Sequence, residues 1–180
     1  IAVAKDKLKG EEIEFIIADA EEVKLDGTFD LIISNAVFQW FPNLDTSLSR
    51  YRELMSEGGA IIFSSFGPKT FFELGLVIKD ALGPRNSSMT SHSFLGLDDI
   101  KSSLRAKFND TYFEKRIYRR LYISLSELFD DIRYSGTRGL GVRSGGVWTK
   151  RTVNAVEESY KKRFGRIIAT YEIFFCRGIK

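Results

Sequence analysis

The sequence predicts an α/β fold whose sheet is mostly parallel, with an antiparallel edge near its C-terminal end. The unbroken apolar run at residues 31–33 is typical of a strand buried on both faces of a parallel sheet. A helical pattern and a second apolar strand at residues 60–66 follow, which predicts a strand–helix–strand unit with a right-handed crossover. Partial alternation over residues 112–123 favours an antiparallel edge strand.

The first half of the chain contains two further helices and one further strand by the same criteria. Residues 1–9 have the pattern of the end of a helix that stops at Gly10. The isoleucine-rich segment 13–18 predicts a strand. Asp45 is a candidate N-cap for the helix after the 31–33 strand, and residues 70–82 return to helical spacing.

The second half predicts three helices and a last strand. The spacing of apolar residues predicts a helix over 97–108. Ser124 and Glu127 have the spacing of a capping box, which marks the start of another helix. A third helix is expected over 149–165, and the final strand over 167–176.

Composition indicates a single globular domain without metal or disulfide chemistry. The chain has 180 residues, of which 43% are hydrophobic and 28% charged, and no apolar run reaches membrane-spanning length. Cys176 is the single cysteine and lies in an apolar segment, so it is expected to be a buried small hydrophobe rather than a nucleophile. With His92 as the single histidine, no zinc site is expected. One cysteine fits a reducing, cytoplasmic location.

Charge is distributed unevenly along the chain. Residues 1–100 contain 9 Lys and Arg against 16 Asp and Glu, a net charge of −7, whereas residues 101–180 contain 18 against 8, a net charge of +10. The second half therefore presents a basic surface to an acidic partner. Nucleic acid, an anionic membrane and an acidic protein all remain open on charge alone.

A ligand crevice is predicted where the 31–33 strand ends. Ligands of open α/β sheets bind beyond the carboxyl ends of the strands. Small and polar residues replace the branched ones from Ser34 onward, so residues 34–40 are expected to form a wall of that crevice. Pattern alone slightly favours an ordinary strand followed by a loop over such a crevice.

The identity of the residues adds a resemblance. The segments Asp-Leu-Ile-Ile-Ser-Asn-Ala from Asp30, Phe-Ile-Ile-Ala-Asp-Ala-Glu from Phe15 and Gly-Gly-Ala-Ile-Ile-Phe-Ser from Gly58 resemble the Rossmann-like S-adenosylmethionine-dependent methyltransferases. Three motifs resemble a narrower family, the malonyl-[acyl-carrier protein] O-methyltransferases of biotin synthesis. They are Ser-Asn-Ala-x-x-Gln-Trp from Ser34, Phe-Ser-Ser-Phe-Gly-Pro from Phe63, and Thr-Tyr-Glu from Thr170.

The resemblance implies a set of residues that bind S-adenosylmethionine. Asp19 and Ala20 would lie beside the adenine, with the carboxylate accepting from the exocyclic amine. Asn35, Ala36 and Gln39 would lie at the methionine and methyl end. An alternative for Asp19 is a helix N-cap with Glu22 three residues on.

The resemblance also implies an acceptor pocket. Trp40, Phe66 and Thr70 would face the crevice, although core packing explains Trp40 and Phe66 equally well. Arg138 and Arg143 lie in a basic, glycine-rich segment and are candidates for a contact with a carboxylate or phosphate.

The function implied is transfer of a methyl group from S-adenosylmethionine to the free carboxylate of a malonyl thioester on acyl carrier protein. A carboxylate is already ionised at neutral pH, so no catalytic base is expected. The basic residues of the second half would meet the acidic carrier, with no nucleic acid or membrane involved. They are Arg116, Arg119, Arg120, Lys161, Lys162 and Arg163. The alternatives are a methyltransferase of this fold acting on another small molecule, and a non-enzymatic nucleic-acid-binding domain.

Two motifs of the methyltransferases do not occur before the 13–18 segment. These are the glycine-rich loop under the cofactor and the acidic residue that holds its ribose. We therefore expect residues 1–180 to form one methyltransferase domain that is incomplete at its N-terminus. About two strand–helix units, roughly 60–90 residues, would precede it.

Overall fold

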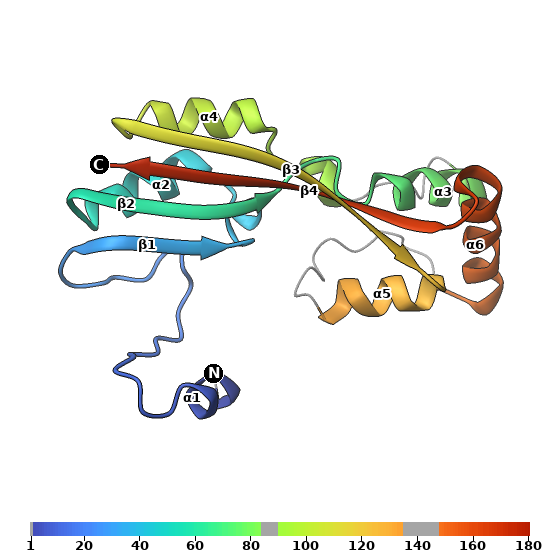
Figure 1. The fold of residues 1–180 in the computed structure, drawn as a ribbon, viewed down its shortest axis with the longest axis horizontal. Helices are drawn as coiled ribbons and strands as arrows, with labels where there is room; N and C mark the ends of the chain where they lie inside the picture. The colour runs from blue at the N-terminus through green and yellow to red at the C-terminus, as the bar shows by residue number, and fades with distance from the viewer. Residues whose placement is uncertain (1, 84–89, 135–147) are drawn as a thin grey trace.

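A computed structural model describes residues 2–83, 90–134 and 148–180, and its framework is one four-stranded mixed sheet (Figure 1). The strands lie in the order β1-β2-β4-β3. The pair β1–β2 is parallel, and β4 pairs antiparallel with both β2 and β3. The strands are β1 (Phe29–Asn35), β2 (Met55–Phe66), β3 (Asp110–Tyr122) and β4 (Ile167–Ile179).

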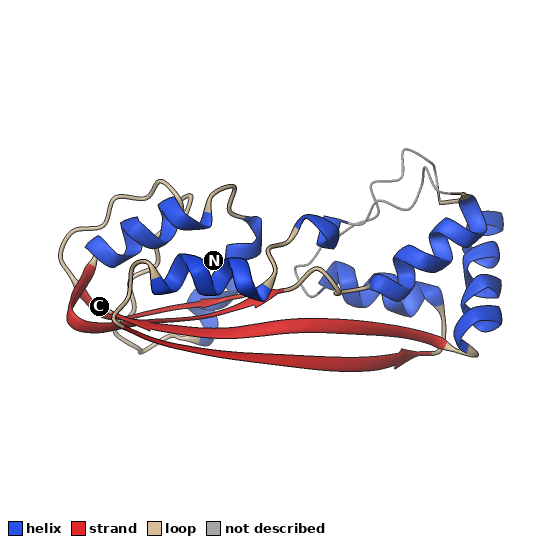
Figure 2. Ribbon diagram, turned by 90° about the horizontal axis from the view of Figure 1, so that it is seen from above, coloured by secondary structure: helices blue, strands red, loops and turns tan. Residues whose placement is uncertain are grey.

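Helices cover the sheet in two groups. The pair α2 and α4 packs near the β1–β2 end, while α3, α5 and α6 surround the far end of the long β3–β4 ribbon (Figure 1). Most helices lie to one side of the strands (Figure 2). The α-helices are α1 (Ala2–Lys7), α2 (Leu44–Glu53), α3 (Phe72–Leu82), α4 (Leu97–Arg105), α5 (Leu125–Tyr134) and α6 (Lys150–Phe164). Short 3₁₀ helices are η1 (Phe38–Trp40) and η3 (Thr90–Ser93).

Each helix group has its own hydrophobic core. The α2–α4 cluster contains Leu48, Phe63, Leu104 and Phe174, together with seven other buried side chains. The α3–α6 cluster is built from buried residues of the three helices and of the far end of the ribbon. Among them are Leu74, Leu128, Tyr160, Ile167 and Ala169. The β3–β4 ribbon therefore joins two cores, and both depend on the burial of apolar surface.

The two cores use opposite faces of the ribbon. Ile167 and Ala169 are buried at one end of β4, whereas Phe174 and Cys176, of the other parity, are buried at the other end. The change occurs between Ala169 and Thr170, which are both buried. Side chains alternate across a strand, and strands twist about their own axes. Because the ribbon twists along its length, it presents one face to the first core and the opposite face to the second.

Most of the predicted elements are confirmed, as are the α/β class and the antiparallel C-terminal edge. The strands expected at 60–66, 112–123 and 167–176 correspond to β2, β3 and β4. Ser124 caps α5 as expected, because its Oγ accepts from Glu127 N at 3.1 Å; Glu127 Oε2 accepts from Ile123 N at 2.7 Å, one residue before the cap, and not from Ser124 N as in a complete capping box. Thr149 caps α6 through Thr152 N, and Gly165, with φ of 72°, ends it.

The strand predicted at residues 13–18 is wrong. This segment has no regular structure, and Ile16 and Ile17 are 52% and 84% exposed. A strand is held by hydrogen bonds to a neighbouring strand. Within the described ranges, no strand lies beside this segment. It instead links α1 to the sheet as an extended connection (Figure 1).

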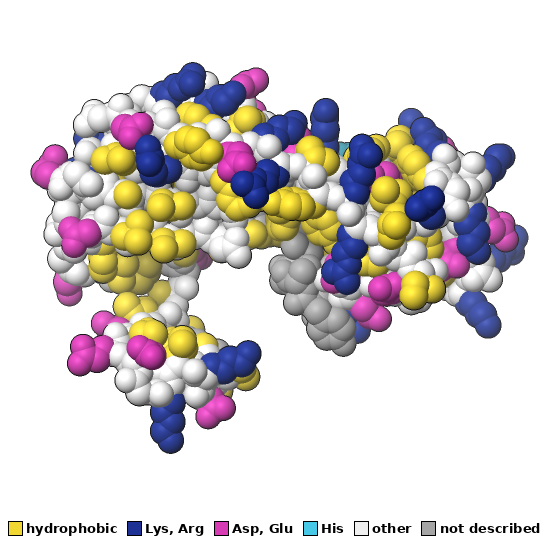
Figure 3. Space-filling view, viewed as in Figure 1, with side chains coloured by type: hydrophobic (Ala, Val, Ile, Leu, Met, Phe, Trp, Pro, Cys, Tyr) yellow, Lys and Arg dark blue, Asp and Glu magenta, His cyan; other side chains and the backbone are white. Residues whose placement is uncertain are grey.

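The expectation that residues 31–33 are buried on both faces is also wrong. Ile32 packs against the α2–α4 cluster, but Leu31 is 51% exposed and Ile33 is 68% exposed. β1 is an edge strand, and the described part of the chain places no helix over this face of it. Figure 3 shows hydrophobic side chains gathered over the β1–β2 region. Ile62 of β2, which pairs with Ile33, is 43% exposed on the same face.

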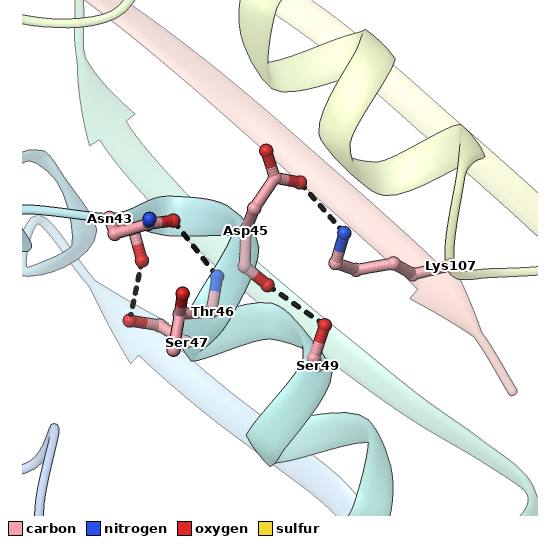
Figure 4. A network of polar contacts seen from close by, with 6 residues as sticks. All are labelled: Asn43, Asp45, Thr46, Ser47, Ser49 and Lys107. Carbon is pink, nitrogen blue, oxygen red and sulfur yellow. Dashed lines mark hydrogen bonds and ion pairs between the residues drawn. The ribbon is translucent and has the colours of Figure 1, made fainter.

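The N-terminus of α2 differs from the prediction by two residues (Figure 4). The cap is Asn43, whose Oδ1 accepts from Thr46 N at 3.0 Å. Asp45 lies in the first turn and forms an ion pair with Lys107 Nζ at 2.7 Å. The hydrogen bond from Lys107 lowers the pKa of Asp45. Asp45 therefore joins α2 to the segment after α4 instead of capping the helix.

Candidate functional site

The carboxyl ends of β1 and β2 meet in register at one edge of the sheet. Asn35 is aligned with Ser64, and Ser64 Oγ donates to Asn35 Oδ1 at 2.5 Å. The next backbone N–H, that of Ala36, donates to Ser64 Oγ at 3.0 Å. The turn that leaves β1 is thus fixed to β2 by a serine side chain.

The turn itself has an uncommon backbone conformation. Ala36 has φ of 53°, in the left-handed region that non-glycine residues seldom adopt. Gln39 stabilises this turn, because its Nε2 donates to the Ala36 carbonyl at 2.6 Å and its Oε1 lies 3.5 Å from Ser65 Oγ. Strained turns of this kind concentrate at ligand-binding sites. Asn35, Ala36 and Gln39, which were predicted together, are therefore brought together.

A groove of about 300 Å³ runs along the end of β1. Its lining residues come from β1, η1, α2 and the 19–21 segment: Ala20, Ile32, Ile33, Ser34, Asn35, Val37, Phe38, Phe41 and Tyr51. Tyr51 Oη donates to the Ala20 carbonyl at 2.8 Å, and Arg50 Nη1 donates to the Glu21 carbonyl. Two residues of α2 therefore hold Ala20 at the groove, next to the strand end that carries Asn35.

Asp19 caps a turn and not a helix. Its Oδ1 accepts from Glu21 N at 2.8 Å, and its carbonyl accepts from Glu22 N and Val23 N at 3.2 and 2.8 Å. No helix follows, so the helix N-cap alternative is wrong. Asp19 Oδ2 has no hydrogen-bond partner among residues 2–83, 90–134 and 148–180. One carboxylate oxygen thus remains open to a ligand.

The residues predicted for the acceptor pocket differ in how deeply they are buried. Trp40 keeps 36% of its surface exposed and packs edge-on against Phe94, with ring centroids 5.4 Å apart. Phe66 is half-buried, 6.4 Å from the ring centroid of Tyr171. Thr70 is fully buried. Its hydroxyl donates to the Glu172 carbonyl and accepts from the Glu172 backbone N–H, both at 3.2 Å. Arg138 and Arg143 lie outside the described residues.

Two polar clusters near these residues were not predicted from the sequence. In the first, the hydroxyls of Tyr122 and Tyr171 lie 2.6 Å apart, and both donate to Asp131 Oδ2, at 2.6 and 2.9 Å. In the second, the buried carboxylate of Glu172 lies 2.6 Å from Lys115 Nζ. Each cluster joins residues distant in the sequence. The Thr-Tyr-Glu motif from Thr170 supplies a member of each and was the one available signal.

The electrostatics of the tyrosine cluster follow from partial burial. Burial raises the pKa of Tyr171 to about 12, and burial together with the hydrogen bond to Asp131 raises that of Tyr122. Burial alone would raise the pKa of Asp131. The hydrogen bonds from the two tyrosines and the charge of Arg120 outweigh that effect and lower it. The cluster therefore holds two neutral hydroxyls and one carboxylate at neutral pH.

Neither a metal centre nor a membrane span is found in the described part of the chain. Its His, Cys, Asp and Glu side chains form no group of three or more that could hold a metal ion. None of its helices is both long and apolar enough to cross a membrane. Cys176 is buried, as predicted, and burial raises the pKa of its thiol to about 12.

Comparison with known sequences gives consistent matches. Residues 1–63 match the family model described as Methyltransferase domain. A malonyl-[acyl-carrier protein] O-methyltransferase 2 of Ilyobacter polytropus is 29% identical over 89% of this chain and 61% of that protein. Malonyl-[acyl-carrier protein] O-methyltransferases of Priestia megaterium and Bacillus cytotoxicus are 36% and 29% identical over 56% and 98% of this chain. These matches span 38% and 64% of those proteins, so the chain spans under two thirds of each of the three relatives.

Solved structures show the same fold. A putative methyltransferase of Bacillus halodurans superposes with a TM-score of 0.60 at 16% identity, covering 99% of this chain and 78% of that one. The YcgJ protein of Bacillus subtilis gives a TM-score of 0.61 at 14% identity, covering 99% and 76%. The chain thus has the Rossmann-like methyltransferase fold and is similar, over most of its length, to the malonyl-[acyl-carrier protein] O-methyltransferases.

Proposed function

We propose that this protein is an S-adenosylmethionine-dependent O-methyltransferase that esterifies the free carboxylate of a malonyl thioester on acyl carrier protein. One observation carries the proposal. The ends of β1 and β2 bring Asn35, Ala36 and Gln39 together beside a groove that Ala20 also lines. The acceptor is taken from the three relatives, which are malonyl-[acyl-carrier protein] O-methyltransferases, and their similarity extends over most of the chain.

The residues at the groove fit the methyl donor. Its walls are largely apolar, which suits a flat adenine ring, and about 300 Å³ lies at the lower end of ligand-pocket volumes. Asn35 Nδ2 has no hydrogen-bond partner in the part of the chain that the structure describes, so it is free to contact the polar methionine end. When bound, S-adenosylmethionine supplies an electrophilic methyl group on a sulfonium.

The chain's own residues then contribute alignment and the exclusion of water. The malonyl carboxylate has a reference pKa near 4 and needs no base to become nucleophilic. Holding it in line with the methyl group, in a site shielded from water, lowers the barrier through proximity and desolvation. The exposed part of Trp40 and the half-buried ring of Phe66 supply apolar walls for that purpose. Arg138 and Arg143 remain candidates for a contact with a carboxylate or phosphate.

A methyl-transfer assay with labelled S-adenosylmethionine tests the proposal. Malonyl-carrier protein is expected to be methylated much faster than free malonate or other small carboxylic acids. The acetyl-carrier protein, which lacks the free carboxylate, is the matched negative control. Equal or faster transfer to a small acid would replace the carrier-borne acceptor with a small molecule. No transfer to any carboxylate would reject the reaction.

A further inference from the structure

A second groove, of about 460 Å³, lies at the middle of the β3–β4 ribbon, between the two helix groups. Three basic and two large apolar side chains line it, together with one threonine: Lys69, Lys115, Arg119, Phe72, Ile117 and Thr170. None of these residues belongs to the groove at the end of β1. The lining of this groove is therefore both positively charged and apolar.

The register of the ribbon explains why the cations gather there. Lys115, Ile117 and Arg119 alternate along β3 and so point to the same face. This stretch lies between the two cores, and both Lys115 and Arg119 are exposed. Lys69 joins them from the turn that follows β2.

A buried carboxylate organises the groove. The side chain of Glu172 is 2% exposed. Its Oε1 lies 2.6 Å from Lys115 Nζ, and its Oε2 accepts from the backbone N–H of Lys69 at 2.9 Å. The close approach requires glycine at position 67, because a Cβ there would lie 2.5 Å from Glu172 Oε2. One side chain of β4 therefore fixes both a lysine of β3 and the turn that carries Lys69.

The groove keeps uncompensated positive charge. Lys69 and Arg119 have no acidic partner within the described ranges. Glu172 pairs with Lys115, and a second buried carboxylate, that of Glu73, is hydrogen-bonded to Thr170, so three cations face two carboxylates. On the opposite face of β3 the arginines are paired: Arg116 with Glu114 at 2.6 Å and Arg120 with Asp131 at 2.8 Å. Unpaired cations concentrated in a groove favour an anionic ligand, and the planar guanidinium of Arg119 matches a phosphate.

We infer that this groove binds the phosphorylated thioester arm of an acyl carrier, with the phosphate between Lys69 and Arg119. Phe72 and Ile117 would contact the uncharged chain of the arm. This inference rests on the proposed function. Lys69 lies three residues beyond Phe66, one of the predicted acceptor walls, so an arm held here leads toward the end of β2. The groove thus defines a docking subsite separate from the site of methyl transfer.

Binding of 4′-phosphopantetheine and of unphosphorylated pantetheine, each titrated into the protein and followed by NMR, tests the subsite without methyl transfer. The phosphorylated compound should bind about tenfold more tightly, the scale of a charge-assisted hydrogen bond. Arg119→Gln and Lys69→Gln should each remove most of that difference. Arg116→Gln, on the opposite face of the same strand, is the control and should leave it unchanged. Melting temperatures show whether each variant is folded.

The outcomes separate the subsite from the reaction. Equal affinity for the two compounds, or equal loss in Arg116→Gln and Arg119→Gln, would overturn the inference. Weaker binding of the whole carrier by Arg119→Gln, with phosphopantetheine binding unchanged, would also overturn it, since the cations would then meet acidic side chains of the carrier. Phosphate-dependent binding through Arg119 in a protein that methylates no malonyl thioester would support the subsite and reject the proposed function.

Discussion

Single residues at the ends of β1 and β2 divide into those that hold the turn and those left open to a ligand. The Gln39 amide and the Ser64 hydroxyl are both engaged within the protein. Asn35 Nδ2 and Asp19 Oδ2, by contrast, have no partner in the described part of the chain. The open groups belong to residues that the resemblance assigned to the methyl donor.

Asp19→Ala is expected to weaken binding of S-adenosylmethionine by about 1–3 kcal/mol, the scale of losing a charged hydrogen-bond partner. The melting temperature should change little, because Asp19 caps only an exposed turn. Calorimetric titration measures the affinity. Asp26→Ala, another exposed acid nearby, is the control. A lowered melting temperature with unchanged affinity would assign Asp19 a purely structural role.

The thiol of Cys176 should be unreactive in the folded protein. It is 2% exposed, and burial raises its pKa to about 12. Because the thiolate is the reactive form, an aromatic disulfide reagent at about pH 8 should modify the native protein far more slowly than a free thiol, whose pKa is near 8.5. The same protein in denaturant should react at once. Rapid labelling without denaturant would show that the β4 core opens readily.

At the scale of elements, the sequence predicted what local pattern determines. The helices ending at Leu82 and Phe164, and the start of α5 at its Ser124 cap, follow from apolar spacing and capping residues nearby in the chain. The prediction of a strand at residues 13–18 was wrong because a strand depends on a neighbouring strand, which the local sequence pattern does not reveal. The cap of α2 was misplaced because Asn43 and Asp45 are both good capping residues, and the ion pair with Lys107 is distant in the sequence.

The attachment of α5 to the ribbon depends on Asp131, which accepts from Tyr122 and Tyr171 and pairs with Arg120. Asp131→Asn is expected to lower the free energy of unfolding by about 1–3 kcal/mol at pH 7. The pKa of Asp131 is lower in the folded protein than its ordinary value. The stabilisation is therefore present above the ordinary carboxyl pKa and is lost as the pH falls through the folded value.

Urea unfolding of wild type and Asp131→Asn at pH 7 and at about pH 3 measures this effect. The difference between the two proteins should shrink at the lower pH, because the Asp131 carboxyl of the unfolded chain, with its ordinary pKa of about 3.9, is then largely protonated and the unfolded state gains that proton's binding energy. Asp130→Asn, at the exposed neighbouring position, is the control and should be close to neutral. A difference independent of pH would mean that shape, and not charge, makes Asp131 important.

At the scale of the whole molecule, positive charge gathers on the β3–β4 ribbon, apart from the groove at the end of β1. The net charge of −7 over residues 1–100 and of +10 over residues 101–180 separates an acidic part, with the groove at the end of β1, from a basic part. The charge split could be read from the sequence. Its concentration beside Glu172 could not, because the position of Lys115 and Arg119 over β4 depends on strand register.

Added salt should therefore weaken recognition of the carrier more than that of a small acceptor. Raising ionic strength from about 0.05 to 0.3 M shortens the Debye length and screens the basic surface. The KM for malonyl-carrier protein is expected to rise several-fold, while the KM for malonyl-pantetheine, which has no phosphate and no protein surface, stays nearly constant. Steady-state assays at both ionic strengths measure the two KM values. A parallel rise for both acceptors would locate the salt effect at the malonyl carboxylate.

The change of buried face along β4 has a consequence for how the chain tolerates insertions and deletions. Cys176 and Phe174 set the alternation for one core, and Ile167 and Ala169 set the opposite alternation for the other. One extra residue between Ala169 and Phe174 would leave one core aligned and turn the whole buried set of the other toward water. Two extra residues would restore the alternation in both. Length changes in this stretch are therefore expected to persist in even steps and to be lost in odd ones.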